Sequence, residues 1–279
     1  MSAGLHVIFG LTGLPFVGYA GLFGVGAYVA ALMNTRWHID TNWALLVAPI
    51  VTSALSLVLA LLFIRLKDVY FMIVSLAVGQ LIPIIAAAWA VTGGPNGLYG
   101  IAPIHIAGHD FIDLKSLYYL SLVFVLASIV FLAVFGRSRT GVSWLAIGRD
   151  ENAAEALGIR TKSSKVWALT LGGAWAGLAG TLYAAQLSAI SPDAFTVYDS
   201  ILLASAVLIG GRGSLGGTVL GAAVLYALPE IFRELAEYRL LVFGVAIMVI
   251  LKVRPEGLLP RRSRQFKVDP VAAPESVAA

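Results

Sequence analysis

Long runs of apolar residues without a charged side chain dominate this sequence. A helix needs about 20 mostly apolar residues to cross a membrane. Four segments meet this requirement, namely residues 43–64, 69–91, 116–135 and 166–189. Apolar residues make up 59% of the chain and charged residues 12%, against about 45–50% and about 25% in soluble domains. A soluble fold could not cover so much apolar surface, so a soluble enzyme and a disordered chain are both excluded.

Three further apolar segments are broken or short. Residues 4–33 are long enough to span, but Gly13, Pro15, Gly18 and Gly21 are expected to break or kink the helix. Residues 199–232 are interrupted by a glycine-rich stretch at 210–217, which predicts two short helices or a re-entrant pair. Residues 240–253 form a short final run. Because irregular backbone cannot face lipid, the glycine-rich stretch must be buried in protein or line water.

Lys and Arg residues are distributed unevenly between the two sides of the expected bundle. Counting 199–232 as two spans gives an all-α, polytopic transmembrane bundle of about eight crossings with broken, short helices. An alternation from a cytoplasmic start puts most of the 19 Lys and Arg residues inside, mainly in 136–165 and after residue 251. The outside retains Arg36, Lys115, Arg233 and Arg239. Cytoplasmic loops are richer in Lys and Arg, so we expect both termini in the cytoplasm.

The central parts of the spans lack the groups that would power transport or catalysis. They contain no Asp, Glu, His, Lys or Arg, and Gln80 is the most polar side chain deep in a span. Ion-coupled transporters place ionisable residues there. The chain has no phosphate-binding loop and no cysteine, and we expect neither a cofactor nor a metal. Residues 211–216 match Gly-x-Gly-x-x-Gly, but their apolar flanks favour a tight connection between helices over a nucleotide site.

Small residues recur at helical spacing in several spans. Gly173 and Gly177 form a Gly-x-x-x-Gly pair with Gly180 one turn further, and Gly217 and Gly221 form another pair. Small residues let membrane helices approach closely. The spacing favours packing within the chain and leaves a subunit interface or a pore lining as the alternative.

The loop 136–165 is longer than a simple connection requires. Asn152 is suited to cap a short helix, Glu155 stands at capping-box spacing, and Gly158 is suited to end the helix. A short helix with small apolar side chains could sit in a socket on another protein. The alternative from the pattern alone is an ordinary interfacial helix.

Several stretches together carry a family resemblance. Residues 150–159 read Asp-Glu-Asn-Ala-Ala-Glu-Ala-Leu-Gly-Ile, and 92–98 read Thr-Gly-Gly-Pro-Asn-Gly-Leu. Residues 24–28, 176–180 and 254–258 agree in order and spacing. In these stretches the chain resembles the LivM-like permeases of bacterial branched-chain amino-acid ABC importers, from about residue 4 to residue 259. The chain departs from the family in beginning almost inside the broken span and in reading Phe-Val-Gly-Tyr at 16–19, where a Ser-Leu-Gly-His-like stretch is common.

The resemblance implies a transport subunit with no enzymatic activity of its own, in the bacterial inner membrane. The implied partners are a second homologous permease, two ABC ATPases and a periplasmic substrate-binding protein. Branched-chain amino acids are the implied solutes, with urea or short amides as the alternative. A passive solute channel and a membrane scaffold that transports nothing are the competing interpretations. Nothing indicates a nucleic-acid partner.

The resemblance and the pattern also assign residues to roles. The coupling role falls on Asn152, Ala154, Glu155 and Gly158. We expect a periplasmic mouth at Gly93, Gly94, Asn96 and Gly97. The candidate pore-lining residues are Tyr28, Gln80 and Tyr183. We expect residues 1–259 to form the transmembrane domain, with the coupling loop at 136–165, and residues 260–279 to form a basic, disordered cytoplasmic tail.

Overall fold

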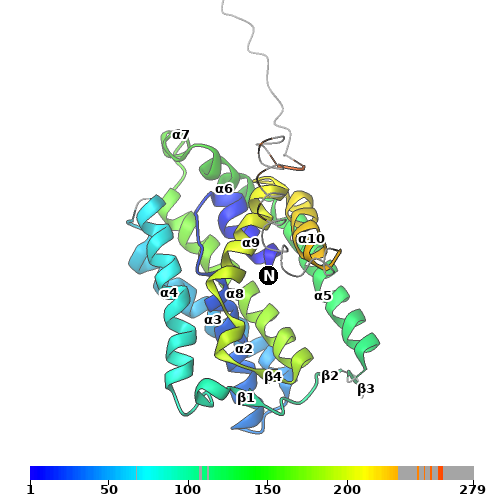
Figure 1. Ribbon diagram of the computed structural model, residues 1–279. Helices are drawn as coiled ribbons and strands as arrows, with labels where there is room; N and C mark the ends of the chain where they lie inside the picture. Colours follow the sequence, from blue (N-terminus) through cyan, green and yellow to red (C-terminus); the bar gives the residue numbers. More distant parts are fainter. Residues whose placement is uncertain are drawn as a thin grey trace, which may run out of the picture.

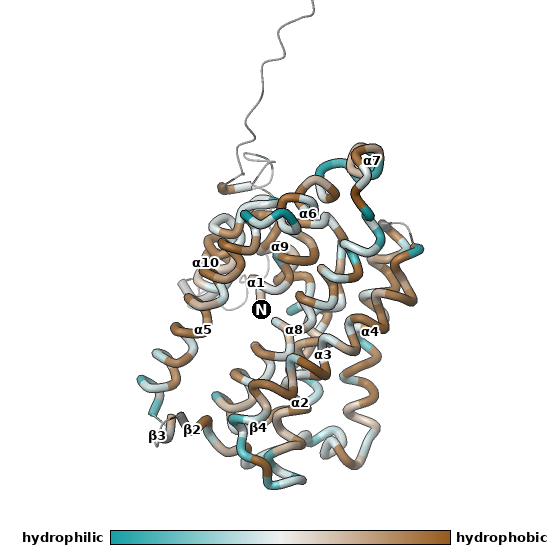
Figure 2. Tube along the Cα trace, turned by 180° about the vertical axis from the view of Figure 1, so that it is seen from behind, coloured by the Kyte–Doolittle hydropathy of each residue, from teal (hydrophilic) through white to brown (hydrophobic). Residues whose placement is uncertain are grey.

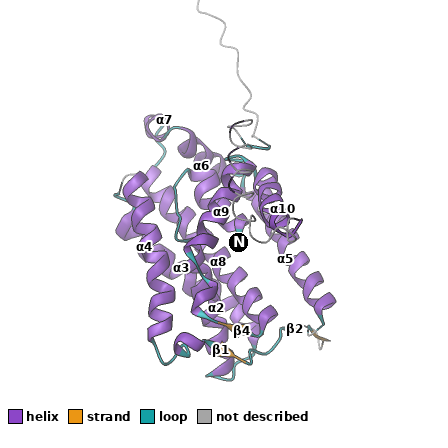
Figure 3. Ribbon diagram, in the orientation of Figure 1, coloured by secondary structure: helices purple, strands orange, loops and turns teal. Residues whose placement is uncertain are grey.

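The computed structural model describes residues 1–66, 68–106, 109–111, 113–231, 244, 248, 252 and 257–259. Within these residues nearly all regular structure is helical, and the strands are two-residue segments at one end of the bundle (Figure 3). The all-α class predicted from the apolar runs is therefore confirmed. The predicted final run at 240–253 and the predicted tail at 260–279 lie largely or wholly outside the described residues.

The first apolar segment is broken, as the sequence predicts. It consists of α1 (Ser2–Leu5), a π-helix (His6–Leu11), a non-helical linker at 13–18, and α2 (Tyr19–Thr35). Gly13 has φ +71°, which most side chains avoid, and Pro15 removes a backbone donor. The predicted break at Gly21 is wrong, because Gly21 lies inside α2. A Cβ at Gly21 would lie 2.6 Å from the carbonyl oxygen of Gly79, so this glycine serves close helix packing.

Four long helices follow the predicted spans. They are α3 (Thr41–Phe63), α4 (Asp68–Ala88), α5 (Leu114–Phe135) and α8 (Thr161–Leu187). Helix α8 packs against both α2 and α3, and its glycines permit this. A Cβ at Gly173 would lie 2.6 Å from Ser56 Cβ in α3, and one at Gly180 would lie 2.6 Å from the amide of Ala27 in α2. This small-residue face of α8 therefore packs within the chain, which confirms the favoured prediction from the glycine spacing.

The glycine-rich stretch joins two short helices, α9 (Val197–Gly210) and α10 (Leu215–Ile231). Gly211 and Gly213 have φ of +105° and +79°, which suits a tight turn. The two helices pack together where a Cβ at Gly221 would lie 2.8 Å from the amide of Gly210. With the 3-10 turn before it, α9 forms the segment Pro192–Gly210, which is long and apolar enough to cross a membrane, whereas the described part of α10 includes a shorter apolar helix, Leu215–Ala227. The stretch is therefore a connection between two helices, as predicted.

Polar segments gather at the two ends of the bundle (Figures 1 and 2). One end, called the α7 end, carries α6 (Arg139–Arg149) and α7 (Glu151–Ala156). The other, called the β1 end, carries β1 (Leu98–Tyr99), which pairs antiparallel with β4 (Ala189–Ile190). Two 3-10 turns also lie there, at Gly94–Asn96 and Pro192–Ala194, as does the pair β2 (His105–Ile106) and β3 (His109–Asp110).

The faces of α3, α4 and α5 that point away from the bundle are apolar and exposed. Leu46 and Ile50 on α3, Ile84 on α4, and Val123 and Val130 on α5 are each more than half exposed. Four described helical segments are long and apolar enough to cross a membrane; they lie in α3, α4 and α5 and at Pro192–Gly210, whereas α8 is not among them. Such an exposed apolar belt is stable in lipid and not in water. The structure is therefore a helical membrane bundle, and the count of about eight crossings stays a prediction.

Candidate functional site

The predicted coupling helix exists, and its cap differs from the prediction. Helix α7 begins at Glu151, and the carboxylate of Asp150 accepts a hydrogen bond from the amide of Ala153 at 3.0 Å. Asp150 is therefore the N-cap, and the prediction that Asn152 caps the helix is wrong. An Asp side chain at this position accepts a hydrogen bond from a backbone amide that has no partner within the helix, and its negative charge is stabilised by the positive N-terminal end of the helix dipole. Gly158 has φ +81° just beyond the helix, so its predicted role as the stop is confirmed.

The residues predicted for coupling do not share one face of α7. Asn152, Glu155 and Gly158 are exposed, whereas Ala154 is 2% exposed and packs into the bundle. Leu157 is 80% exposed, the highest value among the large apolar side chains of the described residues. This exposure leaves the tip of α7 accessible to a partner. Sequence reasoning did not single out Leu157, although its place next to Gly158 could have indicated it.

Two polar contacts tie α7 to the start of α8. The hydroxyl of Thr161 donates to the carboxylate of Glu155 at 2.6 Å, and Lys165 forms an ion pair with Glu151, also at 2.6 Å. The Lys165 side chain is only 12% exposed, so its charge requires this partner. Glu155 therefore fixes the end of α7 to α8, and the predicted capping box is absent.

An unpredicted helix, α6, connects α7 to the broken first element. Trp144 and Ile147 of α6 are buried together with Ala154 of α7 and with Val7 and Leu11 of the π-helix. A displacement of α7 would thus reach the π-helix through packed side chains, since close-packed interiors transmit strain. The three-residue spacing of Gly141, Trp144 and Ile147 was the sequence signal for this helix.

A cavity of about 510 Å³ lies beneath α7. Its lining includes three charged side chains, Glu151, Lys165 and Arg212, together with Gly13 in the linker and Leu208 in α9. The guanidinium carbon of Arg212 lies 5.0 Å from the centre of the Phe9 ring, which is a cation–π geometry. The cavity therefore combines charges at the α7 end with an apolar side that faces the bundle.

The predicted pore residues fall into two places. Tyr28 and Tyr183 meet around Phe195, with ring centres 6.0 and 6.2 Å from that of Phe195, and Phe23 completes the cluster. Tyr28 is 5% exposed, and its hydroxyl has no hydrogen-bond partner among the described residues. Gln80 lies partly exposed on α4. Two of the three residues thus belong to an aromatic cluster.

The predicted mouth residues form a compact turn at the β1 end. Gly93, Gly94 and Gly97 have φ between +62° and +82°, and Asn96 is exposed. Gly97 packs directly on the backbone of Ile190, next to the β1–β4 pair. The turn is therefore locked to the segment that follows α8, at the end of the bundle opposite α7 (Figure 1).

A buried polar contact joins the first element to α10. The Nδ1 atom of His6 lies 2.8 Å from the hydroxyl of Thr218, and both residues are buried. Sequence reasoning found no His in the central parts of the spans, and it missed this contact because His6 stands near the start of the first segment.

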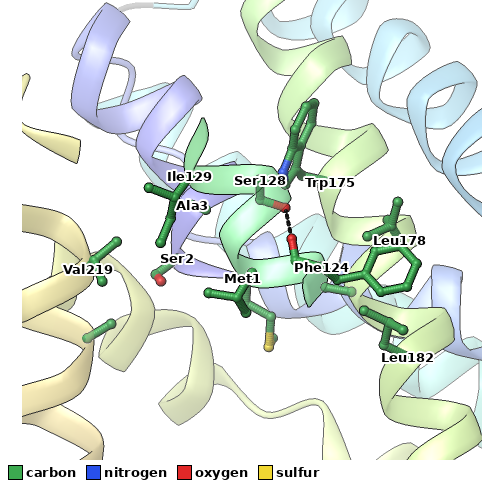
Figure 4. Close-up of a pocket in the computed structure, with 13 residues that line it drawn as sticks. Met1, Ser2, Ala3, Phe124, Ser128, Ile129, Trp175, Leu178, Leu182 and Val219 are labelled. Atoms are coloured by element: carbon green, nitrogen blue, oxygen red, sulfur yellow. Dashed lines mark hydrogen bonds between the residues drawn. The ribbon is translucent and has the colours of Figure 1, made fainter. Parts of the chain in front are cut away.

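A separate apolar pocket of about 230 Å³ has Met1 in its lining (Figure 4), and the N-terminus lies halfway along the bundle (Figure 1). Leu178 and Trp175 of α8 line the pocket, and the Ser128 hydroxyl of α5 donates to the Phe124 carbonyl at 2.7 Å. The pocket lies away from α6. The part of the first element that contacts α6 is Gly13, where an added Cβ would lie 3.2 Å from the Cα of Gly148.

Comparison with known proteins agrees with this architecture. The family described as the permease component of branched-chain amino acid transport systems matches residues 1–251. The chain belongs to this family. The high-affinity branched-chain amino acid permease LivM of Escherichia coli is 32% identical over 98% of this chain and 70% of its own length. A probable LivM of Methanocaldococcus jannaschii is 25% identical over 94% of the chain and 90% of its own.

More distant relatives cover about half of the chain. The autoinducer 2 import permease LsrC of Yersinia pseudotuberculosis is 30% identical over 52% of the chain and 46% of its own length. No solved structure matches. The chain is a membrane permease subunit of the ABC-importer class, a transport component that works with other parts of an ABC transporter.

Proposed function

We propose that this permease forms one half of the pore of a bacterial inner-membrane importer for branched-chain or related amino acids. A second homologous permease completes the pore, two ABC ATPases supply the energy, and a periplasmic binding protein delivers the solute. The identity to two LivM proteins over nearly the whole chain supports this proposal.

The α7 end faces the cytoplasm in this proposal. Arg137, Arg139, Arg149, Arg160 and Lys162 all lie on or beside α6 and α7, and Lys and Arg are enriched in cytoplasmic loops. The turn at Gly93–Gly97 then faces the periplasm and shapes the mouth beneath the binding protein. The C-terminus is proposed to be cytoplasmic, whereas the predicted cytoplasmic N-terminus is not part of the proposal, because Met1 lies halfway along the bundle (Figure 1).

The observation that carries the coupling role is the exposed tip of α7 on a buried base. Asn152, Glu155, Leu157 and Gly158 would contact the ATPase. Ala154 would act from inside, because its side chain packs on α6. ATP-driven movement of α7 would pass through Trp144 and Ile147 to the π-helix and tilt the broken element, a gating motion of packed helices.

A paired substitution tests the docking surface. Leu157→Asp places a charge at the exposed tip, and Val142→Asp places the same charge at an exposed site on α6. We expect the tagged Leu157→Asp permease to accumulate normally in membranes and to lose its co-purifying ATPase, while Val142→Asp retains it. Retention of the ATPase by both variants would remove α7 as the docking element.

Reconstitution tests the transport function itself. Proteoliposomes holding the permease pair and the ATPases, supplied with the binding protein, should take up labelled leucine only when ATP is present. Uptake that continues without ATP would instead establish a passive channel.

A further inference from the structure

The linker at 13–18 is irregular backbone held between two helices at membrane depth. The amide of Val17 donates to the hydroxyl of Ser75 on α4, and the amide of Ala20 donates to the hydroxyl of Ser200 on α9, each at 3.1 Å. Both serines are buried. Non-helical backbone is stable within a membrane only where protein buries it or where it lines a water-filled cavity. The linker meets the first condition, because α4 and α9 bury one side of it, and a cavity lies along another side.

That cavity has a volume of about 360 Å³. Phe16 and Val17 of the linker line it, and Ser205 is the polar side chain among its otherwise apolar described lining. It shares Phe9, Pro15, Met72 and Leu208 with the charged cavity beneath α7. The two cavities are therefore adjacent, and together they are called the linker groove, which extends from Arg212 and Lys165 to the linker.

Regular helical spacing builds the two side walls of the linker groove. On α9, Ile201, Ser205 and Leu208 lie on one face, and Arg212 follows four residues later. On α4, Met72 and Leu76 line the groove at four-residue spacing. Gln80 continues that spacing by one more turn, so this predicted pore residue stands on the lining face of α4.

The groove is open along one side. Ile73 is 56% exposed and Ile201 is 50% exposed, although both line the cavity. Among the described residues, none covers this side of the groove. In the proposed function, the second permease supplies the missing wall, which would place the groove at the centre of the complete pore.

We propose that the linker groove is the path by which the solute leaves toward the α7 end, and that its walls take a small neutral or zwitterionic solute with an apolar side chain. This inference rests on the proposed function. The apolar lining accommodates the side chain without a fixed charge that would trap the solute, and the Ser205 hydroxyl offers a hydrogen bond to its polar groups. At the outlet, Glu151 and Lys165 neutralise each other, which leaves Arg212 stacked on Phe9 beside them.

Cysteine accessibility tests the path without requiring transport. The chain contains no cysteine, so in a Ser205→Cys or Leu76→Cys variant the introduced thiol is the only one in the permease that can react. Ala54→Cys, on the exposed face of α3, is the matched control. The assembled importer in inside-out and right-side-out vesicles is treated with a charged thiol reagent that does not cross membranes. Such a reagent reacts with a thiolate that water can reach. Because position 205 lines the proposed path and position 54 faces lipid, we expect Ser205→Cys to react at least about tenfold faster than Ala54→Cys. We also expect this reaction to be faster from the α7 side. Equal rates at both positions, or faster reaction from the β1 side, would overturn the proposal.

A steric block links the path to transport. Ala204→Phe fills the groove, and Ala54→Phe adds the same bulk on α3 outside it. We expect uptake to fall more than about tenfold only for Ala204→Phe, with the ATPase still co-purifying. A bulky thiol reagent that modifies Ser205→Cys in the assembled importer obstructs the groove after folding is complete. A loss of uptake in that protein is therefore not caused by misfolding. Normal uptake in both blocked proteins would overturn the path, whereas absent uptake in the unmodified importer would contradict the proposed function instead.

Discussion

The backbone of Gly13, in the break of the first element, lies directly against the backbone of Gly148 at the end of α6. A Cβ on Gly13 would come within 3.2 Å of the Cα of Gly148, and one on Gly148 would come within 3.1 Å of the Gly13 amide. This contact joins the linker groove to the helices of the α7 end. Any movement of α6 and α7 must therefore displace the linker or separate the two glycines.

Replacing Gly148 by alanine should loosen that contact. The added methyl group would collide with the carbonyl of Leu11 as well as with Gly13, and overpacking of this kind costs about 1–3 kcal/mol. We expect a lower melting temperature in detergent and reduced coupling of ATP hydrolysis to uptake. Gly216→Ala, where nothing lies within 4 Å of the new Cβ, is the control and should melt at or above the parent temperature. Identical melting of both variants would show that the close approach is not structurally required.

The Glu151–Lys165 pair should hold α7 in its orientation. Lys165→Met keeps most of the side-chain volume and leaves Glu151 without its 2.6 Å partner. Because Glu151 is 41% exposed, water replaces part of the interaction, and we expect a loss of about 1 kcal/mol or less. The exchanged double variant Glu151→Lys/Lys165→Glu should recover stability and uptake. If the exchange is as defective as the single change, the charge contact is not what orients α7.

The His6–Thr218 contact should stabilise the packing of the first element on α10. Thr218→Val keeps the shape and removes the hydroxyl that lies 2.8 Å from His6 Nδ1. Loss of a buried hydrogen bond of this kind costs about 1–3 kcal/mol, so the purified permease should unfold at a lower temperature. Thr140→Val, exposed on α6, should have no effect. An unchanged melting temperature for Thr218→Val would mean that the imidazole finds equivalent bonding elsewhere.

The backbone at Gly158 should be essential to the shape of the coupling tip. Its φ of +81° is incompatible with proline, which is fixed near −65°, whereas asparagine tolerates the left-handed region. We expect Gly158→Pro to insert into the membrane normally and to abolish ATP-dependent uptake. Gly158→Asn should transport, since no atom lies within 4 Å of a Cβ at this site. Unchanged uptake in Gly158→Pro would contradict the coupling role of this segment.

Predictions that rest on local chemistry succeeded, and those that depend on neighbours succeeded only in part. Gly158 ends a helix because its own backbone requires it. Asp150 rather than Asn152 caps α7, because both residues can cap and the packing of Ala154 on α6 decides where the helix starts. The pore role of Tyr28 and Tyr183 stays a prediction, and the structure adds that their rings gather around Phe195, a contact between three separate segments that no spacing in the chain specifies.

The sequence by itself determined the long apolar helices, their breaks at Gly13, Pro15 and 210–217, and the family, because apolar length and glycine or proline chemistry act within a few residues. Tertiary structure alone decided that Gly13 meets Gly148, that Ser75 and Ser200 satisfy the linker, and that α4 and α9 wall a groove beside it. These contacts join residues far apart in the chain. Which helix faces meet depends on how small residues such as Gly21, Gly173 and Gly180 allow the backbones to approach.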